Sequence, residues 1–349
     1  MRRAIRIFVG IVIIIVSLGV YFYPDAREWE TQREVKQIME RFEEEFKTEQ
    51  GKEASNHDVV NETTDNIESE TVNADDSVKS YDTDSSEVQI KSFKELHQEM
   101  EAYNKRLVTE EQHIEDAWSY EQPPLTLKNM PNHDYTIGYI EIPDMKIKLP
   151  LLLGASMDNL SKGAAVLSET SMPIGGTDTN CVIAGHRGWK GSAYFQRIEN
   201  LKQGSKVYVT NPWEIMIYQV VKTKVVNPDD SDAILLQPGK DMVTLITCHP
   251  YVLGGGKYRY VVYCERVGTQ NRETAANMKN PSIKKLEKET TENTESIVDE
   301  DSVQVPEEDL KASNELLYWE ERSRKYLPIG TIVLSILIIL IRGRKKKKH

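Results

Sequence analysis

The feature that most constrains the fold is the stretch from Tyr135 to Val267, in which short apolar runs alternate with turn residues. The runs are rich in valine, isoleucine and tyrosine, which favour strands. Turn signals separate them, at Pro143-Asp144, Gly154, Gly175-Gly176, Gly204, Asn211-Pro212, Pro228-Asp229-Asp230, Pro238-Gly239 and Gly254 to Gly256. Many short strands at such spacing predict an all-β barrel or sandwich. Met157 to Gly163 and Ala193 to Leu201 are short helical candidates within it.

Apolar runs near the two ends of the chain predict two membrane-spanning helices. Ile7 to Tyr23 follows three arginines, and Tyr326 to Ile341 precedes the basic tail Arg342 to Lys348. Because basic residues stay on the cytoplasmic side, both termini are expected in the cytoplasm and the rest outside. A cleaved signal peptide is the alternative for the first run, although no convincing small-residue cleavage site follows it. A hydrophobic core helix is the alternative for the second.

These features divide the chain into seven segments. They are an N-terminal anchor (1–24), an amphipathic helix (25–48), an acidic disordered linker (49–90), a helix and loop (91–134), the β domain (135–267), an acidic disordered linker with a juxtamembrane segment (268–325), and a C-terminal membrane segment with a basic tail (326–349). Apolar residues at helical spacing support both helices: Trp29, Val35, Ile38, Met39, Phe42 and Phe46 in the first, and Phe93, Leu96, Met100, Tyr103 and Leu107 in the second.

The composition excludes some classes of partner and cofactor. The net charge of −11 argues against nucleic acid as a partner. No cysteine or histidine spacing suits a metal site, so we expect no metal and no cofactor. Of the three cysteines, Cys181 and Cys264 lie in apolar strand-like runs. Two buried thiols are favoured there over a disulfide.

The third cysteine is a candidate nucleophile. Val243 to Cys248 predicts a buried strand that ends before Pro250, and Arg259 lies eleven residues after the thiol in a second strand-like run, Lys257 to Glu265. A thiol on one strand and a guanidinium on the next can face a common site. The thiol can attack a carbonyl there while the guanidinium holds the carbonyl oxygen. The alternative is that Cys248 is a small buried hydrophobic residue.

His186 is the candidate base for this thiol. It follows the apolar run Cys181 to Ala184 in a glycine-rich bend, so it is expected at a strand end. His249 is a poor candidate, because neighbours on a strand point to opposite faces. The other histidines lie in polar, helical or terminal segments. Brought together, Cys248 and His186 can share a proton and form a thiolate with an imidazolium.

These residues resemble the catalytic signature of sortases, the surface transpeptidases of Gram-positive bacteria. The motif TLITC ends in Cys248, Arg259 follows it, and His186 lies in AGHRG; GYIEIPDMKIKLPLLLGAS, MPIGG and VVNPDD also match. The resemblance covers roughly Tyr135 to Val267 and implies a mainly β fold, a closed eight-stranded barrel with short helices. The proline after TLITC-His and the C-terminal membrane segment are similar to class C, the pilus-assembling sortases.

The resemblance implies an activity and a set of partners. Cys248 would attack the Thr–Gly carbonyl of an LPXTG-like sorting signal on a surface protein or pilin. An amine, a pilin lysine by analogy with class C, would then resolve the thioacyl intermediate. His186 would act as general acid and base, and Arg259 would orient the substrate and stabilise the oxyanion. The protein would sit in the cell membrane of a Gram-positive bacterium. Alternatives are a sortase that uses a cell-wall cross-bridge amine and a non-catalytic membrane scaffold.

A loop before the barrel resembles the class C lid. In that class an Asp-Pro-aromatic motif covers the active site, and here Asp116-Ala117-Trp118 occupies the corresponding place. The resemblance implies that Trp118 lies near the cysteine and Asp116 near the arginine. Because Ala117 replaces the proline, this lid is expected to be less rigid. Otherwise an isolated tryptophan in a loop is a packing anchor.

Overall fold

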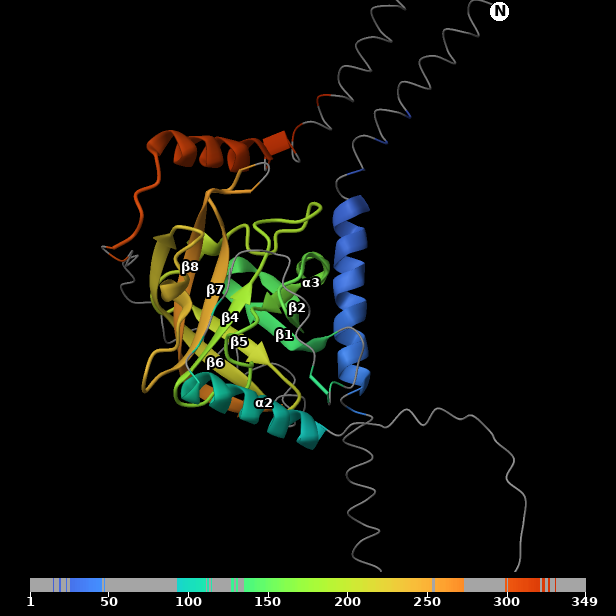
Figure 1. Ribbon diagram of the computed structural model, residues 1–349. Coiled ribbons are helices and arrows are strands. Elements are labelled where there is room, and N and C mark those ends of the chain that lie inside the picture. The colour runs from blue at the N-terminus through green and yellow to red at the C-terminus, as the bar shows by residue number, and fades with distance from the viewer. Residues whose placement is uncertain are drawn as a thin grey trace, which may run out of the picture.

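The computed structural model describes residues 26–45, 93–110, 135–252, 255–272 and 301–320, with a few single positions between and beyond them. Within these residues the chain forms a closed barrel of eight strands, in the order β1-β2-β3-β4-β7-β8-β6-β5 (Figure 1). The sequence pattern predicted an all-β barrel or sandwich, and the structure is the barrel.

The strands are β1 (Thr136–Ile142), β2 (Ile147–Leu153), β3 (Ala164–Val166), β4 (Thr179–Ala184), β5 (Lys206–Thr210), β6 (Glu214–Val226), β7 (Asp241–His249) and β8 (Tyr258–Asn271). The labelled helices are α2 (Phe93–Thr109) and α3 (Met157–Lys162), and 3-10 turns span Pro143–Met145, Ile198–Asn200 and Ser231–Ile234. Residues 26–45 and 307–320 are also helical. Of the two helical candidates inside the barrel, the first forms α3, whereas the second forms only a short 3-10 turn.

Two parallel strand pairs distinguish this barrel from a simple meander. β2 pairs in parallel with β3, and β4 pairs in parallel with β7, whereas the other neighbours are antiparallel. β1 pairs with β5 and closes the barrel. Parallel pairing brings the carboxyl ends of β4 and β7 to the same end of the barrel, which matters for the site.

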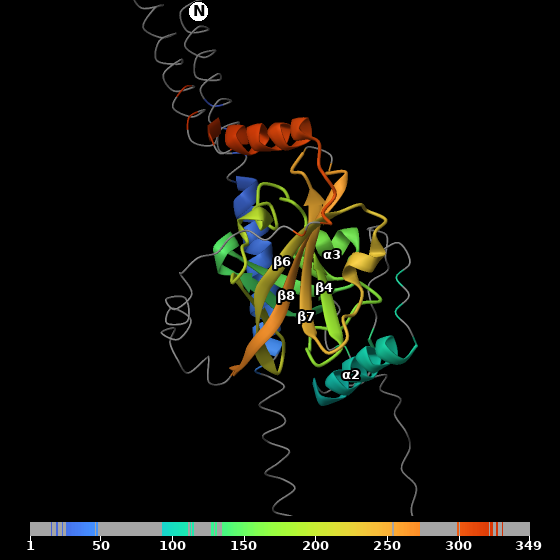
Figure 2. The same cartoon turned by 90° about the vertical axis from the view of Figure 1, so that its left-hand side faces the viewer.

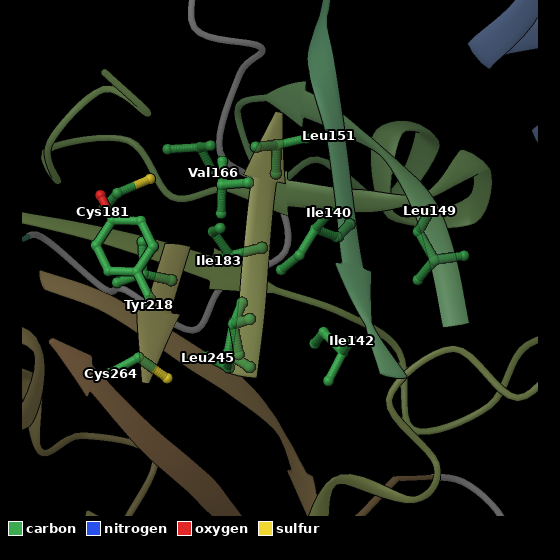
Figure 3. Close-up of a cluster of buried hydrophobic side chains, with 14 of the residues drawn as sticks. Ile140, Ile142, Leu149, Leu151, Val166, Cys181, Ile183, Tyr218, Leu245 and Cys264 are labelled. Carbon is green, nitrogen blue, oxygen red and sulfur yellow. The ribbon is translucent and has the colours of Figure 1, made fainter. Parts of the chain in front are cut away.

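The barrel interior is filled by alternate residues of its strands. Ile140, Ile183, Tyr218, Leu245 and Cys264 belong to one continuous buried cluster (Figure 3). Cys181 and Cys264 are both buried, and neither forms a disulfide, as predicted. Burial raises the pKa of both thiols, since the thiolate is disfavoured away from water. Both thiols are therefore poor nucleophiles.

Helices cover the barrel at its two ends and along one side. α2 lies across one end, and the helix of residues 307–320 lies beside the other end (Figures 1 and 2). α2 buries Phe93, Leu96, Met100 and Leu107, as its apolar spacing predicted. The helix of residues 26–45 buries Val35, Ile38 and Phe42, also as predicted. Trp29 differs, because it is 64% exposed, with the Arg33 guanidinium over its ring.

Residues 268–325 were predicted to be an acidic disordered linker with a juxtamembrane segment, but parts of the linker that the structure describes are ordered. β8 continues to Asn271, paired with β6 as far as Glu214. Further on, Val303 N donates to Val225 O at 2.9 Å, and Lys222 Nζ lies 2.9 Å from Asp299 Oδ2. The acidic composition gave no sign of this order. Backbone pairing along β6 and a few apolar contacts are enough to order a polar segment.

Several predictions fall outside the described residues. The acidic linker of residues 49–90 and almost all of both apolar end runs are among them. In the part of the chain that the structure describes, no helix is long and apolar enough to cross a membrane.

Candidate functional site

The candidate site is formed where three neighbouring strands end. β7 and β8 are antiparallel, and Cys248 is paired directly with Arg259. β4 and β7 are parallel, and Ala184 is paired with Ile246, so His186 and Cys248 each lie two residues beyond that pair. The ladder continues through Gly185 N, which donates to Ile246 O at 3.1 Å, and Thr247 Oγ1, which donates to Gly185 O at 2.6 Å. The strand ends that carry these three residues are therefore neighbours.

Cys248 and Arg259 lie on the outer face of the barrel wall. On β7, Leu245 points into the interior cluster, whereas Ile246 joins a second cluster with Val261 on the other face. Alternation therefore places Cys248 on the outer face with Arg259, and His249 on the inner face. Cys248 is half-buried and Arg259 is 8% exposed.

Backbone carbonyls of the β7–β8 connection hold the arginine. Arg259 Nη1 donates to Gly256 O at 3.2 Å and to Tyr258 O at 3.0 Å. These bonds hold the guanidinium beside the strand end that carries the thiol, so a group bound at the thiol would meet a fixed positive charge. The turn that the glycine run predicted thus positions the arginine as well as reversing the chain.

An aromatic shell holds the His186 imidazole. Its ring stacks on Trp189, with centroids 4.4 Å apart and planes at 10°. Phe195 N donates to His186 O at 2.9 Å. Gly185 is required beside it, because a Cβ there would lie 2.8 Å from Phe195 Cγ. Sequence reasoning missed Trp189, although a tryptophan three residues after the histidine in the same bend was a usable signal.

Burial decides the protonation state of His186. It lowers the pKa of the imidazole from 6.5 to about 4, since the charged form is disfavoured away from water. The imidazole is therefore neutral at neutral pH. From the sequence, Cys248 and His186 were able to form a thiolate with an imidazolium. The burial of His186 favours a neutral imidazole, which can accept the thiol proton as a base during the reaction.

This lowered pKa predicts how the contribution of His186 depends on pH. A histidine with a pKa of about 4 stays neutral, and able to accept a proton, until the pH falls through about 4. We therefore expect the ratio of Cys248 alkylation rates, unmodified chain over His186→Ala, to be constant from pH 7 to about pH 5 and to collapse near pH 4. Iodoacetamide kinetics with circular dichroism at each pH would measure it. A ratio lost between pH 7 and 6 would mean an ordinary histidine pKa.

A second, charged group lies on the inner face of the same strand ends. Arg187 and His249 are 7% and 4% exposed, and Glu199 contacts both. His249 was predicted to point away from the thiol, which agrees with its position on the inner face. The contacts of His249 with Arg187 and Glu199 were not predicted from the sequence.

The predicted lid and most of the remaining histidines lie outside the described residues. Asp116 and Trp118 of the predicted lid lie outside the described residues, as do His57, His113, His133 and His349. His97 lies on α2 against Trp213, at the barrel end opposite the site. Among the described residues no group of three or more metal-binding side chains is found.

The fold and the site together define a β-barrel protein with cysteine, histidine and arginine at the ends of three adjacent strands. A family profile described as Sortase domain matches residues 140–267. Sortase A of Bacillus anthracis is 33% identical over 160 residues, which are 45% of this chain and 73% of that protein. The chain belongs to the sortase family.

The chain covers other relatives to different extents, and it spans less than two thirds of the length of one of them. Sortase D of Bacillus subtilis is 33% identical over 133 residues, which are 37% of this chain and 63% of that protein. Among solved structures, sortase C of Streptococcus pneumoniae is 30% identical, with a TM-score of 0.46 over 51% of this chain and 90% of that one. Sortase C-3 of the same species is 32% identical, with a TM-score of 0.48 over 53% of this chain and 88% of that one.

Proposed function

We propose that this chain is a membrane-anchored cysteine transpeptidase that cleaves an LPXTG-like sorting signal and transfers the acyl fragment to an amine. The observation that carries the proposal is the pairing of Cys248 with Arg259 across β7 and β8, with His186 at the matching end of β4. It unites a nucleophile, a proton acceptor and a fixed positive charge, which are what acyl transfer requires.

Each residue has one role in the proposed reaction. Cys248 Sγ attacks the Thr–Gly carbonyl carbon while its proton passes to His186, and the carbonyl oxygen becomes an oxyanion beside Arg259. The C–N bond then breaks, and the leaving amine takes the proton from His186. An incoming amine attacks the thioester, giving its proton to His186, which returns it to the sulfur as the C–S bond breaks. No oxidant, metal or cofactor enters this balance.

Class C and a pilin lysine acceptor are the finer part of this proposal. They rest on the proline after the TLITC-His motif and on the apolar C-terminal run. The alternative acceptor is a cell-wall cross-bridge amine. The non-catalytic alternative is a membrane scaffold that uses the barrel only for binding. The presence of Cys248, His186 and Arg259 at neighbouring strand ends argues against it.

One competition experiment tests the reaction and the acceptor together. The full chain in detergent would receive an LPXTG-containing peptide with equal concentrations of a pilin-type lysine peptide and a cross-bridge-type peptide, and products would be read by mass spectrometry. We expect cleavage after threonine and the lysine-linked product. A cross-bridge product would support the alternative acceptor. No cleavage, with Cys248 inert to a thiol-reactive probe, would favour the scaffold.

The lid is part of the proposal and rests on Asp116 and Trp118 alone. An indole is large enough to shield a thiol, and a carboxylate can pair with a guanidinium. An exposed ion pair contributes only about 0–1 kcal/mol of stability, so closure of the lid over the thiol is reversible. Trp118→Ala and Asp116→Ala should each raise the rate at which a small thiol reagent modifies Cys248, and Ala117→Pro should lower it. Unchanged rates in both alanine variants would leave Trp118 an ordinary packing residue.

The proposed topology places both termini in the cytoplasm and the barrel outside. It rests on the basic residues beside each apolar run. In a Cys248→Ala background, an impermeant maleimide added to whole cells should label Val60→Cys but spare Lys346→Cys. Labelling of both from outside would rule out two spans with internal termini.

A further inference from the structure

The side chain of Arg187 connects the two strand ends that carry His186 and Cys248. Arg187 follows His186 directly, and its Nη1 donates to the backbone oxygen of Cys248 at 3.2 Å. Its Nε donates to Gln196 O at 3.2 Å. It is 7% exposed, although arginine is seldom buried so deeply without a specific set of partners.

Glu199 and His249 hold this guanidinium on the inner face. Arg187 Nη2 lies 2.8 Å from Glu199 Oε1, in an ion pair whose angle falls outside hydrogen-bond geometry. His249 Nδ1 lies 3.0 Å from the same carboxylate oxygen and 3.1 Å from Arg187 Nη1. One ring nitrogen cannot donate to the carboxylate and accept from the guanidinium together. Since Nη1 already donates to Cys248 O, we assign the Nδ1 hydrogen to the bond with Glu199.

Arg187 and His249 stabilise the ionised form of Glu199. Burial alone would raise the pKa of Glu199, but the hydrogen bond from His249 and the charge of Arg187 outweigh it and bring the pKa to about 2. Glu199 is therefore ionised at neutral pH. Its side chain is 38% exposed and borders the solvent, whereas Arg187 and His249 are buried. Tyr260 packs on the His249 ring, and burial keeps it a neutral phenol by raising its pKa.

Hydrogen bonds join the two strand ends on both sides of His186. Gly185, one residue before it, is bonded to Ile246 O and to Thr247 Oγ1. Arg187, one residue after it, donates to Cys248 O through its side chain. We propose that Arg187, held by Glu199 and His249, is a positioning residue that fixes the thiol of Cys248 relative to the imidazole of His186. This role rests on the proposed transpeptidase function.

A lysine variant separates positioning from simple stability. Arg187→Lys keeps the buried positive charge beside Glu199, but a single ammonium cannot reproduce the fork that reaches Gln196 O and Cys248 O together. We expect it to unfold within a few degrees of the unmodified chain. Thioacyl-enzyme formation should fall about 100-fold, because a displacement of about 1 Å between reacting groups costs that much, with little change in KM. Arg197→Lys, at an exposed arginine of the same connection, is the matched control and should keep the full rate.

A double-mutant cycle tests whether Arg187 acts through His186. Alkylation of Cys248 by iodoacetamide needs no peptide substrate, so it reads the thiol directly. Arg187→Lys should slow alkylation in the unmodified chain but change it less than about twofold in a His186→Ala background, because coupled residues are not additive. An equal slowing in both backgrounds would show that Arg187 acts on the fold and not on the pair, and would overturn the proposal.

A second variant keeps the proposal testable if Arg187→Lys fails to fold. Glu199→Gln removes the carboxylate charge of a partly exposed side chain. It should slow both thioacyl-enzyme formation and Cys248 alkylation, by a smaller factor than Arg187→Lys. Parent-like rates in every folded Arg187 and Glu199 variant would refute the positioning role. If the unmodified chain formed no thioacyl-enzyme with any peptide, the proposed function would fail, whereas the alkylation cycle would still decide the role of Arg187.

Discussion

Cys248→Ala is expected to abolish thioacyl-enzyme formation, since neither of the other two cysteines can replace it. Cys181 and Cys264 are buried, and burial raises the pKa of both thiols, so neither offers a thiolate to a substrate. The measurement is peptide cleavage by the full chain in detergent, followed with a fluorogenic sorting-signal peptide. Residual cleavage above background would mean that the nucleophile is elsewhere.

Removal of the other two site residues should slow the same reaction without preventing binding. His186→Ala should lower kcat/KM by about 10²–10⁴, the usual contribution of a positioned proton acceptor. Arg259→Ala should cost about 10²–10³, as for loss of one oxyanion donor. Both act on charge that develops in the transition state, so peptide affinity should change little.

Matched controls separate these losses from general damage. His97→Ala removes a partly exposed histidine on α2, beside Trp213 at the opposite end of the barrel. Arg197→Ala removes an exposed arginine. Both should keep most of the activity. Controls as damaging as His186→Ala and Arg259→Ala would indicate that the assay reports folding.

Gly256→Ala is expected to lower the activity by displacing the backbone. A Cβ at this position would lie 2.2 Å from both the carbonyl carbon and the oxygen of His249, so the β7–β8 connection must move. The carbonyl of Gly256 holds Arg259 Nη1, and the guanidinium would move with it. We expect a loss of about 100-fold in kcat/KM, the cost of a displacement near 1 Å, and about 1–3 kcal/mol in the free energy of unfolding.

Gly268→Ala is the control for this substitution. It lies on β8, and a Cβ there would meet only Ile217 Cδ1 at 4.0 Å, an ordinary contact. Its activity and melting temperature should match those of the unmodified chain. A Gly256→Ala protein with full activity would show that the connection tolerates the shift and that Arg259 is held by other bonds.

The barrel and the three site residues could be predicted from the sequence because each is marked by a local sequence pattern. Strand periodicity and turn residues predicted the all-β domain, and Cys248, His186 and Arg259 each follow or begin a strand-like run. The eight-stranded closure came from the family resemblance. Register came only with the structure, since pairing Cys248 with Arg259 depends on the exact turn between them.

The features that sequence reasoning missed depend on contacts between distant segments. Glu199 lies in the run Ala193 to Leu201, which was predicted as a short helix, but its contacts with Arg187 and His249 depend on tertiary packing that no local pattern predicts. Acidic composition wrongly assigned residues 301–310 to a disordered linker, although Val303 pairs with β6. The protonation of His186 follows from burial, which no spacing of residues reveals.

Trapping the thioacyl-enzyme tests the central claim most directly. The full chain would be mixed with a sorting-signal peptide without an amine acceptor, quenched in acid, digested and mapped by mass spectrometry. The account predicts one adduct, with the mass of the fragment ending in threonine, on Cys248, and none in Cys248→Ala. An adduct on any other residue, or peptide cleaved at the same rate by Cys248→Ala, would contradict it.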